Sequence, residues 1–139
     1  EQESGLEGIY KIIEQAGRTC YRSLDKITPD SAKGFVDRMI KSGHGAMLEH
    51  GTVYLKLTPS ETYIYCKYKD NPYTNVNVVY SNNHYPVPTY YVTTNYRVLI
   101  EQGWLDDLKY LCEPTEHHER RVMVRFICDR GVSHKKFVA

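Results

Sequence analysis

The stretch His44-Gly45-Ala46-Met47-Leu48-Glu49-His50-Gly51 runs directly into Thr52-Val53-Tyr54-Leu55-Lys56-Leu57, and the rest of the chain is organised around this junction. Two imidazoles and one carboxylate surround an apolar pair. We expect Met47 and Leu48 to enter a core while the ionisable side chains face outward. Such clusters at the ends of elements are common at functional sites, although the same pattern also fits an ordinary helix-to-strand connection.

The segments on either side of this junction carry clear helix and strand patterns. Apolar residues recur at helical spacing over 6–16, and Gly17 supplies a stop signal. A second helix is predicted to open at Thr28 and to end at Gly43. After the junction, residues 53–57 alternate between apolar and polar, which predicts a half-buried strand that Pro59 closes.

The segment 60–96 has a different composition and is interpreted as a tyrosine-rich insertion. Its tyrosines are accompanied by asparagine, proline and threonine. Residues 62–68, 75–80 and 90–94 have the composition of strands. We expect tyrosine rings to pack on one side while their hydroxyls meet water on the other. A platform for single-stranded nucleic acid is the alternative, but no basic stripe lies between the rings.

The last third of the chain predicts further helices and one strand. Asn95 is a suitable cap for a helix over 96–102 that Gly103 ends, and a helical stripe continues over 105–111. His117 and His118 are interpreted as a solvated cap or loop. Alternation over 122–128 predicts a strand, and a further helix is expected to start after it.

Composition fits a single cytoplasmic domain spanning residues 1–139. The formal net charge is +1, which gives no strong field to attract nucleic acid or an acidic membrane surface. No run approaches the ~18 apolar residues that a membrane span needs. The four cysteines form no C-x-x-C pair, and Cys20 and Cys128 are interpreted as reduced core thiols.

Local motifs of known chemistry do not occur. The sequence holds no Walker loop, G-x-G-x-x-G, G-x-S-x-G or H-E-x-x-H pattern. His44 and His50 do not share a helical face at i,i+4 spacing, so no metal site is predicted. Glu49 beside His50 has the chemistry for acid–base work but no accompanying nucleophile. Arg18 and Arg22 are either anion clamps or solvated cations.

Three separated segments nevertheless resemble the flavin-dependent thymidylate synthases. They are Ala16-Gly17-Arg18-Thr19-Cys20-Tyr21, the Gly43-His44-x-x-x-Leu48-Glu49-His50 pattern, and Val122 to His134 with its ending Cys128-Asp129-Arg130-Gly131-Val132-Ser133-His134. The resemblance implies an α+β fold in which helices flank a twisted antiparallel sheet. It also implies a homotetramer with FAD at subunit interfaces. The implied reaction methylates dUMP to dTMP, with methylenetetrahydrofolate as the carbon donor and NADPH as the reductant.

The same resemblance assigns expected roles to individual residues. His44, Ala46 and Glu49 fall on cofactor-binding positions, and Ala46 stands where relatives usually carry a hydroxyl residue. Arg18 and Cys20 fall on a loop that lines the substrate region in relatives. Lys135 lies near a position that contacts dUMP.

One part of the family pattern is absent. The signature R-H-R-x-x-S does not occur in the 139 residues, so no catalytic residue is assigned within them. The expectation is therefore an N-terminal portion of such an enzyme, inactive on its own. The alternative is a non-catalytic nucleotide-binding remnant or interaction module of the same fold.

Overall fold

The computed structural model describes residues 1–127. Its helices and strands follow in chain order: α1 (Gly5–Cys20), α2 (Ala32–Ser42), α3 (Gly45–Leu48), β1 (Thr52–Leu57), α4 (Thr62–Lys69), β2 (Asn75–Tyr80), β3 (Pro88–Asn95) and α5 (Tyr96–Gln102), with short 3-10 turns at Leu24–Lys26 (η1), Pro59–Glu61 (η2) and Leu105–Tyr110 (η3). None of the helices in this part of the chain is long and apolar enough to cross a membrane.

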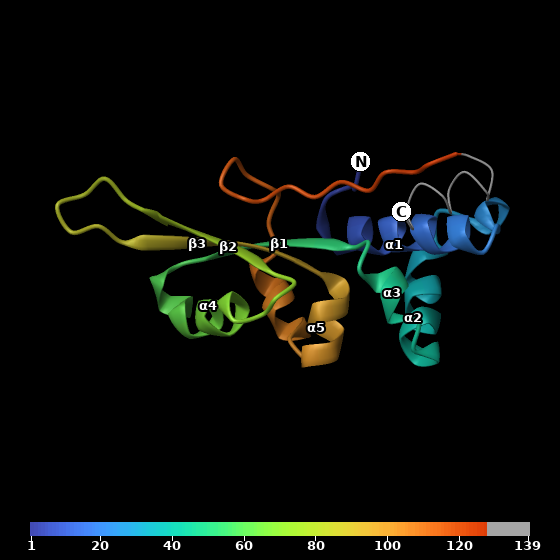
Figure 1. Ribbon diagram of the computed structural model, residues 1–139, viewed down its shortest axis with the longest axis horizontal. Coiled ribbons are helices and arrows are strands. Elements are labelled where there is room, and N and C mark those ends of the chain that lie inside the picture. Colours follow the sequence, from blue (N-terminus) through green and yellow to red (C-terminus); the bar gives the residue numbers. More distant parts are fainter. Residues whose placement is uncertain (128–139) are drawn as a thin grey trace, which may run out of the picture.

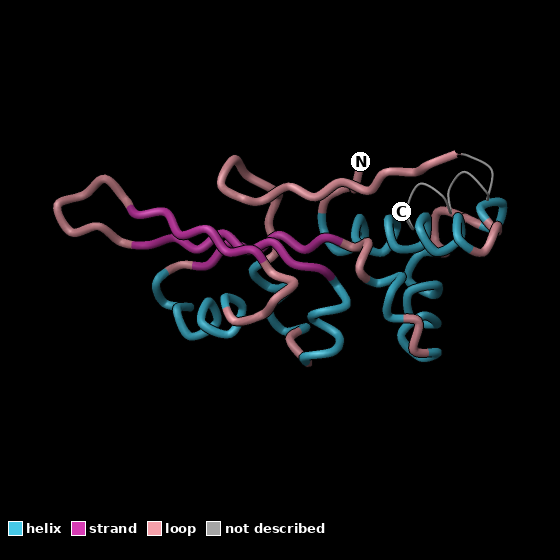
Figure 2. The backbone as a smooth tube through the Cα atoms, viewed as in Figure 1, coloured by secondary structure: helices cyan, strands magenta, loops and turns pink. Residues whose placement is uncertain are grey.

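The strands of the described chain form one antiparallel sheet in the order β1-β3-β2. Helices α4 and α5 lie against one side of it, while α1, α2 and α3 gather beyond one end of β1 (Figure 1). The hairpin that joins β2 and β3 projects at the opposite end. After η3 the chain returns without regular structure along the sheet toward α1 (Figure 2). The predicted α+β class with an antiparallel sheet is confirmed.

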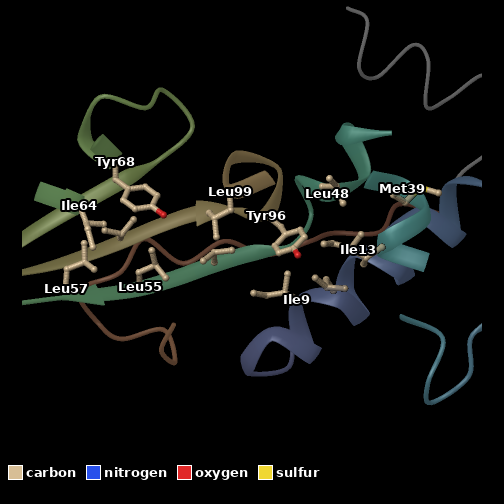
Figure 3. Close-up of a cluster of buried hydrophobic side chains, with 14 of the residues drawn as sticks. Ile9, Ile13, Met39, Leu48, Leu55, Leu57, Ile64, Tyr68, Tyr96 and Leu99 are labelled. Carbon is tan, nitrogen blue, oxygen red and sulfur yellow. The ribbon is translucent and has the colours of Figure 1, made fainter. Parts of the chain in front are cut away.

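A continuous apolar core connects the sheet to the helices at the end of β1. Ile9 and Ile13 from α1 meet Leu48, while Leu55 and Leu99 extend the cluster toward α4 (Figure 3). Complete burial of an aliphatic side chain of this size contributes about 1.5–3 kcal/mol. Buried side chains on both sides of the junction between α3 and β1 therefore anchor it to the core.

Helix α1 continues one turn beyond the predicted stop at Gly17. A Cβ at this glycine would overlap the ring of Phe35, so Gly17 serves close packing of α1 on α2 rather than termination. The helix runs to Cys20, and Arg22 then adopts a positive φ of 54°. Cys20 is exposed, so its prediction as a core thiol is wrong. Cys128 lies outside the described residues.

Helix α2 begins later than predicted. The hydroxyl of Ser31 accepts a hydrogen bond from the Thr28 N–H at 2.9 Å and donates to the Thr28 carbonyl at 3.0 Å. This closed turn holds residues 28–31 outside the helix, which starts at Ala32. The predicted end is confirmed, because Gly43 has a φ of 77° in the left-handed region.

Residues 62–69 form helix α4, so the predicted strand at 62–68 is wrong. The Thr58 N–H donates to the carboxylate of Glu61 at 3.1 Å, which favours a helical start after Pro59. Ile64 and Tyr68 are then buried on one face, four residues apart. Cap and spacing therefore override the strand preference of the residue types. The strands predicted at 75–80 and 90–94 are confirmed as β2 and part of β3.

The segment that follows α5 departs from its predicted structure in two places. Residues 105–110 form a 3-10 helix, which Trp104 precedes, rather than an α-helix. Residues 122–127 belong to no strand of the described chain. The predicted helix after residue 128 lies outside the described residues. The cap at Asn95 is confirmed, since its side-chain oxygen accepts the Val98 N–H at 3.0 Å.

The returning segment is fixed to the free edge of β1. The Cys112 N–H donates to the Tyr54 carbonyl at 2.9 Å. His118 was predicted to be solvated but is only 6% exposed. Its Nε2 lies 2.9 Å from the Leu55 carbonyl, and its Nδ1 lies 3.0 Å from the Thr115 N–H. The ring therefore donates from Nε2 and accepts at Nδ1, which requires a neutral imidazole.

This geometry predicts acid-sensitive stability. Burial lowers the pKa of His118 below its ordinary value of 6.5. Below that pH the unfolded chain binds a proton that the folded chain resists, so stability falls as the pH falls. Denaturant unfolding between pH 7.5 and 5, roughly the range over which histidine titrates, should show a steeper loss for the natural chain than for His118→Gln. The exposed-loop variant His84→Gln should keep the natural slope. Equal slopes for the natural chain and His118→Gln would contradict this account.

Candidate functional site

The turn between α2 and β1 presents polar side chains outward from a buried anchor. Leu48 is 2% exposed and Met47 is partly buried, whereas His44, Glu49 and His50 are exposed. This is the arrangement predicted from the sequence. Short helix α3 is held between α1, α2 and α5, so the backbone of the turn is enclosed on several sides.

His44 lies where the end of α1 meets the turn. His44 directly precedes α3, and its Nδ1 is 3.3 Å from the Ser42 hydroxyl. The imidazole centroid lies 6.1 Å from the ring of Tyr21, which directly follows α1. Cys20, in the last turn of α1, is exposed near the same end of the helix. The structure thus brings two of the sequence-predicted segments together.

Arg18 occupies a different environment from the predicted loop. It lies in the last turn of α1, where its Nε donates to Glu14 Oε2 at 2.8 Å. Both side chains are more than nine-tenths buried, and the guanidinium lies 4.8 Å from the ring centroid of Phe35. Helical spacing of four residues produces this pair. Much of the guanidinium is therefore engaged inside the fold, and its predicted substrate contact stays a prediction.

Glu49 has a partner that the sequence did not reveal. Arg97 Nη1 lies 3.5 Å from Glu49 Oε2, and Arg97 Nε lies 2.7 Å from Glu101 Oε1. The two carboxylates, Glu101 foremost, raise the pKa of the Arg97 guanidinium, which stays charged in any case. Forty-eight positions separate Glu49 from Arg97, so no local pattern pairs them. The contact forms because the fold brings α5 next to α3.

His50 faces a cleft on the other side of the turn. This cleft has a volume of about 390 Å³ and lies between the N-terminal residues, β1 and the returning segment. Its lining carries both signs of charge, including Glu1, Glu3, Arg120 and Arg121. His44, Ala46 and Glu49 are not part of this lining. The turn therefore has two faces, and the predicted flavin-contacting residues lie on the one away from the cleft.

The outer face of the turn carries side chains that can hydrogen-bond an organic molecule. Across residues 1–127, no three His, Cys, Asp or Glu side chains lie together as metal ligands. Exposed Ala46 leaves open surface beside an imidazole, which donates or accepts, and a carboxylate, which accepts hydrogen bonds. A carboxylate can accept from the hydroxyl or ring N–H groups of a flavin nucleotide, and an imidazole can donate to its phosphate. Lys135 lies outside the described residues.

Comparison with known proteins finds three curated relatives, all flavin-dependent thymidylate synthases. The protein from Corynebacterium aurimucosum is 37% identical over 57 residues, which is 40% of this chain and 23% of the relative. The protein from Corynebacterium glutamicum is 35% identical over 60 residues, covering 40% and 24%. The protein from Mycolicibacterium vanbaalenii is 41% identical over 54 residues, covering 37% and 22%.

These matches support the predicted resemblance to that family, over 37–40% of this chain. Each match spans less than a quarter of the relative's length. No family model matches the chain. No solved structure matches it either.

The buried pair of Arg18 and Glu14 yields a stability prediction. Arg18→Met should lower the free energy of unfolding by about 3 kcal/mol, because it leaves a buried carboxylate without its partner. The double variant Glu14→Leu/Arg18→Met should regain most of this loss, since it removes both charges. Urea unfolding measures both. An Arg18→Met variant as stable as the natural chain would contradict this structural role. Substrate binding can then be measured on the folded double variant, which lacks Arg18.

Proposed function

We propose that this chain is part of a flavin-dependent thymidylate synthase, in which the turn from His44 to Gly51 forms one part of the flavin site. The observation that carries the proposal is the coincidence of two findings. Curated relatives of that name match the chain. The turn that carries the family pattern also presents its imidazole and carboxylate outward from a buried anchor.

The proposed activity belongs to the intact protein. It converts dUMP to dTMP, takes the carbon unit from methylenetetrahydrofolate and draws its reducing equivalents from NADPH. The bound cofactor, FAD, would supply the redox chemistry, and the protein would supply position and charge. We place FAD between subunits of a homotetramer. The free thiols of Cys20, Cys66 and Cys112 favour a reducing, cytoplasmic setting.

Roles within the site follow from the chemistry of each side chain. His44 and Glu49 would hydrogen-bond the cofactor and fix its orientation. Ala46 has no side-chain polar atom, so only its backbone would take part. Cys20, at the end of α1, and Lys135 would face the substrate side, with Arg18 either contacting substrate or supporting the end of α1 from within.

The 139 residues alone are proposed to be inactive. The R-H-R-x-x-S signature, whose arginines and histidine would complete the cofactor and nucleotide sites, does not occur in them. What the present residues do is hold one polar surface in place. Their proposed role is to bind and orient, and none of them is assigned to forming or breaking a bond to the substrate.

Flavin binding and turnover test this proposal. The intact protein should retain FAD, seen in its visible absorbance, and should form dTMP from dUMP with methylenetetrahydrofolate and NADPH. Glu49→Ala and His44→Ala should each weaken FAD binding by about tenfold, since each removes a directed hydrogen bond worth roughly 1.4 kcal/mol. Glu7→Gln, which neutralises an exposed carboxylate on α1, is the matched control and should bind FAD normally.

Other outcomes separate the alternatives. An intact protein that binds neither FAD nor dUMP would overturn the assignment. Nucleotide binding without flavin and without turnover would identify a non-catalytic module of the same fold instead.

A further inference from the structure

We propose that Arg97 of α5 is a positioning residue for the flavin-facing turn, because its guanidinium bridges Glu49 and Glu101 while lying against the backbone of Gly45. The expected effect on FAD binding rests on the proposed function, whereas the contacts of Arg97 do not. It also gives the tyrosine-rich segment a role, since α5 directly follows the last strand of that segment and brings Arg97 to α3.

The guanidinium is held from two directions. Its Nε lies 2.7 Å from Glu101 Oε1, one helical turn further along α5. Its Nη1 lies 3.5 Å from Glu49 Oε2, at the end of α3. Planar guanidinium groups present several N–H donors in a fixed fork, so a bond on one side sets the direction of the other. Glu101 thereby aims Arg97 at the carboxylate that we assign to the flavin.

Gly45 provides the space that this contact needs. A Cβ at Gly45 would lie 2.9 Å from Arg97 Nε, 3.2 Å from Cζ and 3.4 Å from Nη2. The guanidinium therefore lies against the first residue of α3 at a distance that only a glycine permits without displacement. Two contacts, one at each end of α3, define the position of the arginine relative to the turn.

The backbone next to Arg97 is anchored independently. The Tyr96 N–H donates to the Gly51 carbonyl at 2.8 Å, which joins the start of α5 to the end of the turn. Tyr96 is 4% exposed, and Asn95 caps the helix. The backbone at Arg97 is therefore held in place, and its side chain extends to Glu49 from a fixed position.

The contact orients the turn more than it stabilises the fold. Arg97 and Glu49 are both more than a third exposed, and exposed pairs of this kind add little to global stability. Loss of Arg97 should therefore leave the unfolding transition nearly unchanged. What it should change is the order of the residues that carry Ala46 and Glu49, and with it the fit of the cofactor.

Amide hydrogen exchange on the chain, combined with FAD titration of the intact protein, tests the inference. Arg97→Gln should speed exchange of the Glu49 and His50 amides, which donate to the carbonyls of Ala46 and Met47. It should also weaken FAD binding by about tenfold. Arg97→Lys, which keeps the charge and part of the reach, should recover part of the affinity. Lys33→Gln breaks an exposed pair on α2 and is the control that should change neither readout.

A double-variant comparison identifies the route of the effect. Gly45→Ala should displace the guanidinium and speed the same amides. In the Arg97→Gln background, Gly45→Ala should add little, because the group that it displaces is gone. Equal effects of Gly45→Ala in both backgrounds, or unchanged exchange in Arg97→Gln, would overturn the inference. If the intact protein binds no FAD at all, the proposed function fails, while the exchange data still decide the role of Arg97.

Discussion

The close contact of Gly51 with α1 is the constraint on which the rest of the structure depends. A Cβ at this glycine would lie 2.7 Å from Cδ1 of Ile13 and 2.8 Å from Cγ2 of Ile9. The two isoleucines are almost fully buried, so they have no room to move aside. The beginning of β1 is therefore pressed against the helix, and the turn that precedes it must leave the core at this point.

From this contact follows the position of the polar turn. The Gly51 carbonyl also accepts a hydrogen bond from the Tyr96 N–H. The same residue therefore packs against α1 and is hydrogen-bonded to the start of α5. Leu48 enters the core three residues earlier with Met47 packed beside it, and the side chains of His44, Glu49 and His50 face outward. An exposed imidazole and carboxylate on a backbone fixed in this way form a surface that needs little reorganisation to bind a ligand. The proposed flavin contact uses that property.

Sequence reasoning succeeded where structure is decided locally. The cap at Asn95, the end of α2 at Gly43 and the outward-facing turn each depend on a few neighbouring residues. It failed where the structure depends on contacts between residues far apart in the sequence. Residues 62–69 look like a strand by composition, but the cap and the burial of Ile64 and Tyr68 make a helix. Burial of His118 depends on the edge of β1, and the Arg97–Glu49 contact depends on the return of the chain after the hairpin.

The turn is held in place by α1 and α5 before any ligand binds. The amide exchange rate of Tyr96 tests it most directly, because that amide donates to Gly51 and connects both sides. We expect the Tyr96 amide to exchange as slowly as the hydrogen-bonded amides of β3, opening only with global unfolding. Exchange of Tyr96 at the rate of the exposed hairpin loop would contradict it, because the turn would then be free of α5.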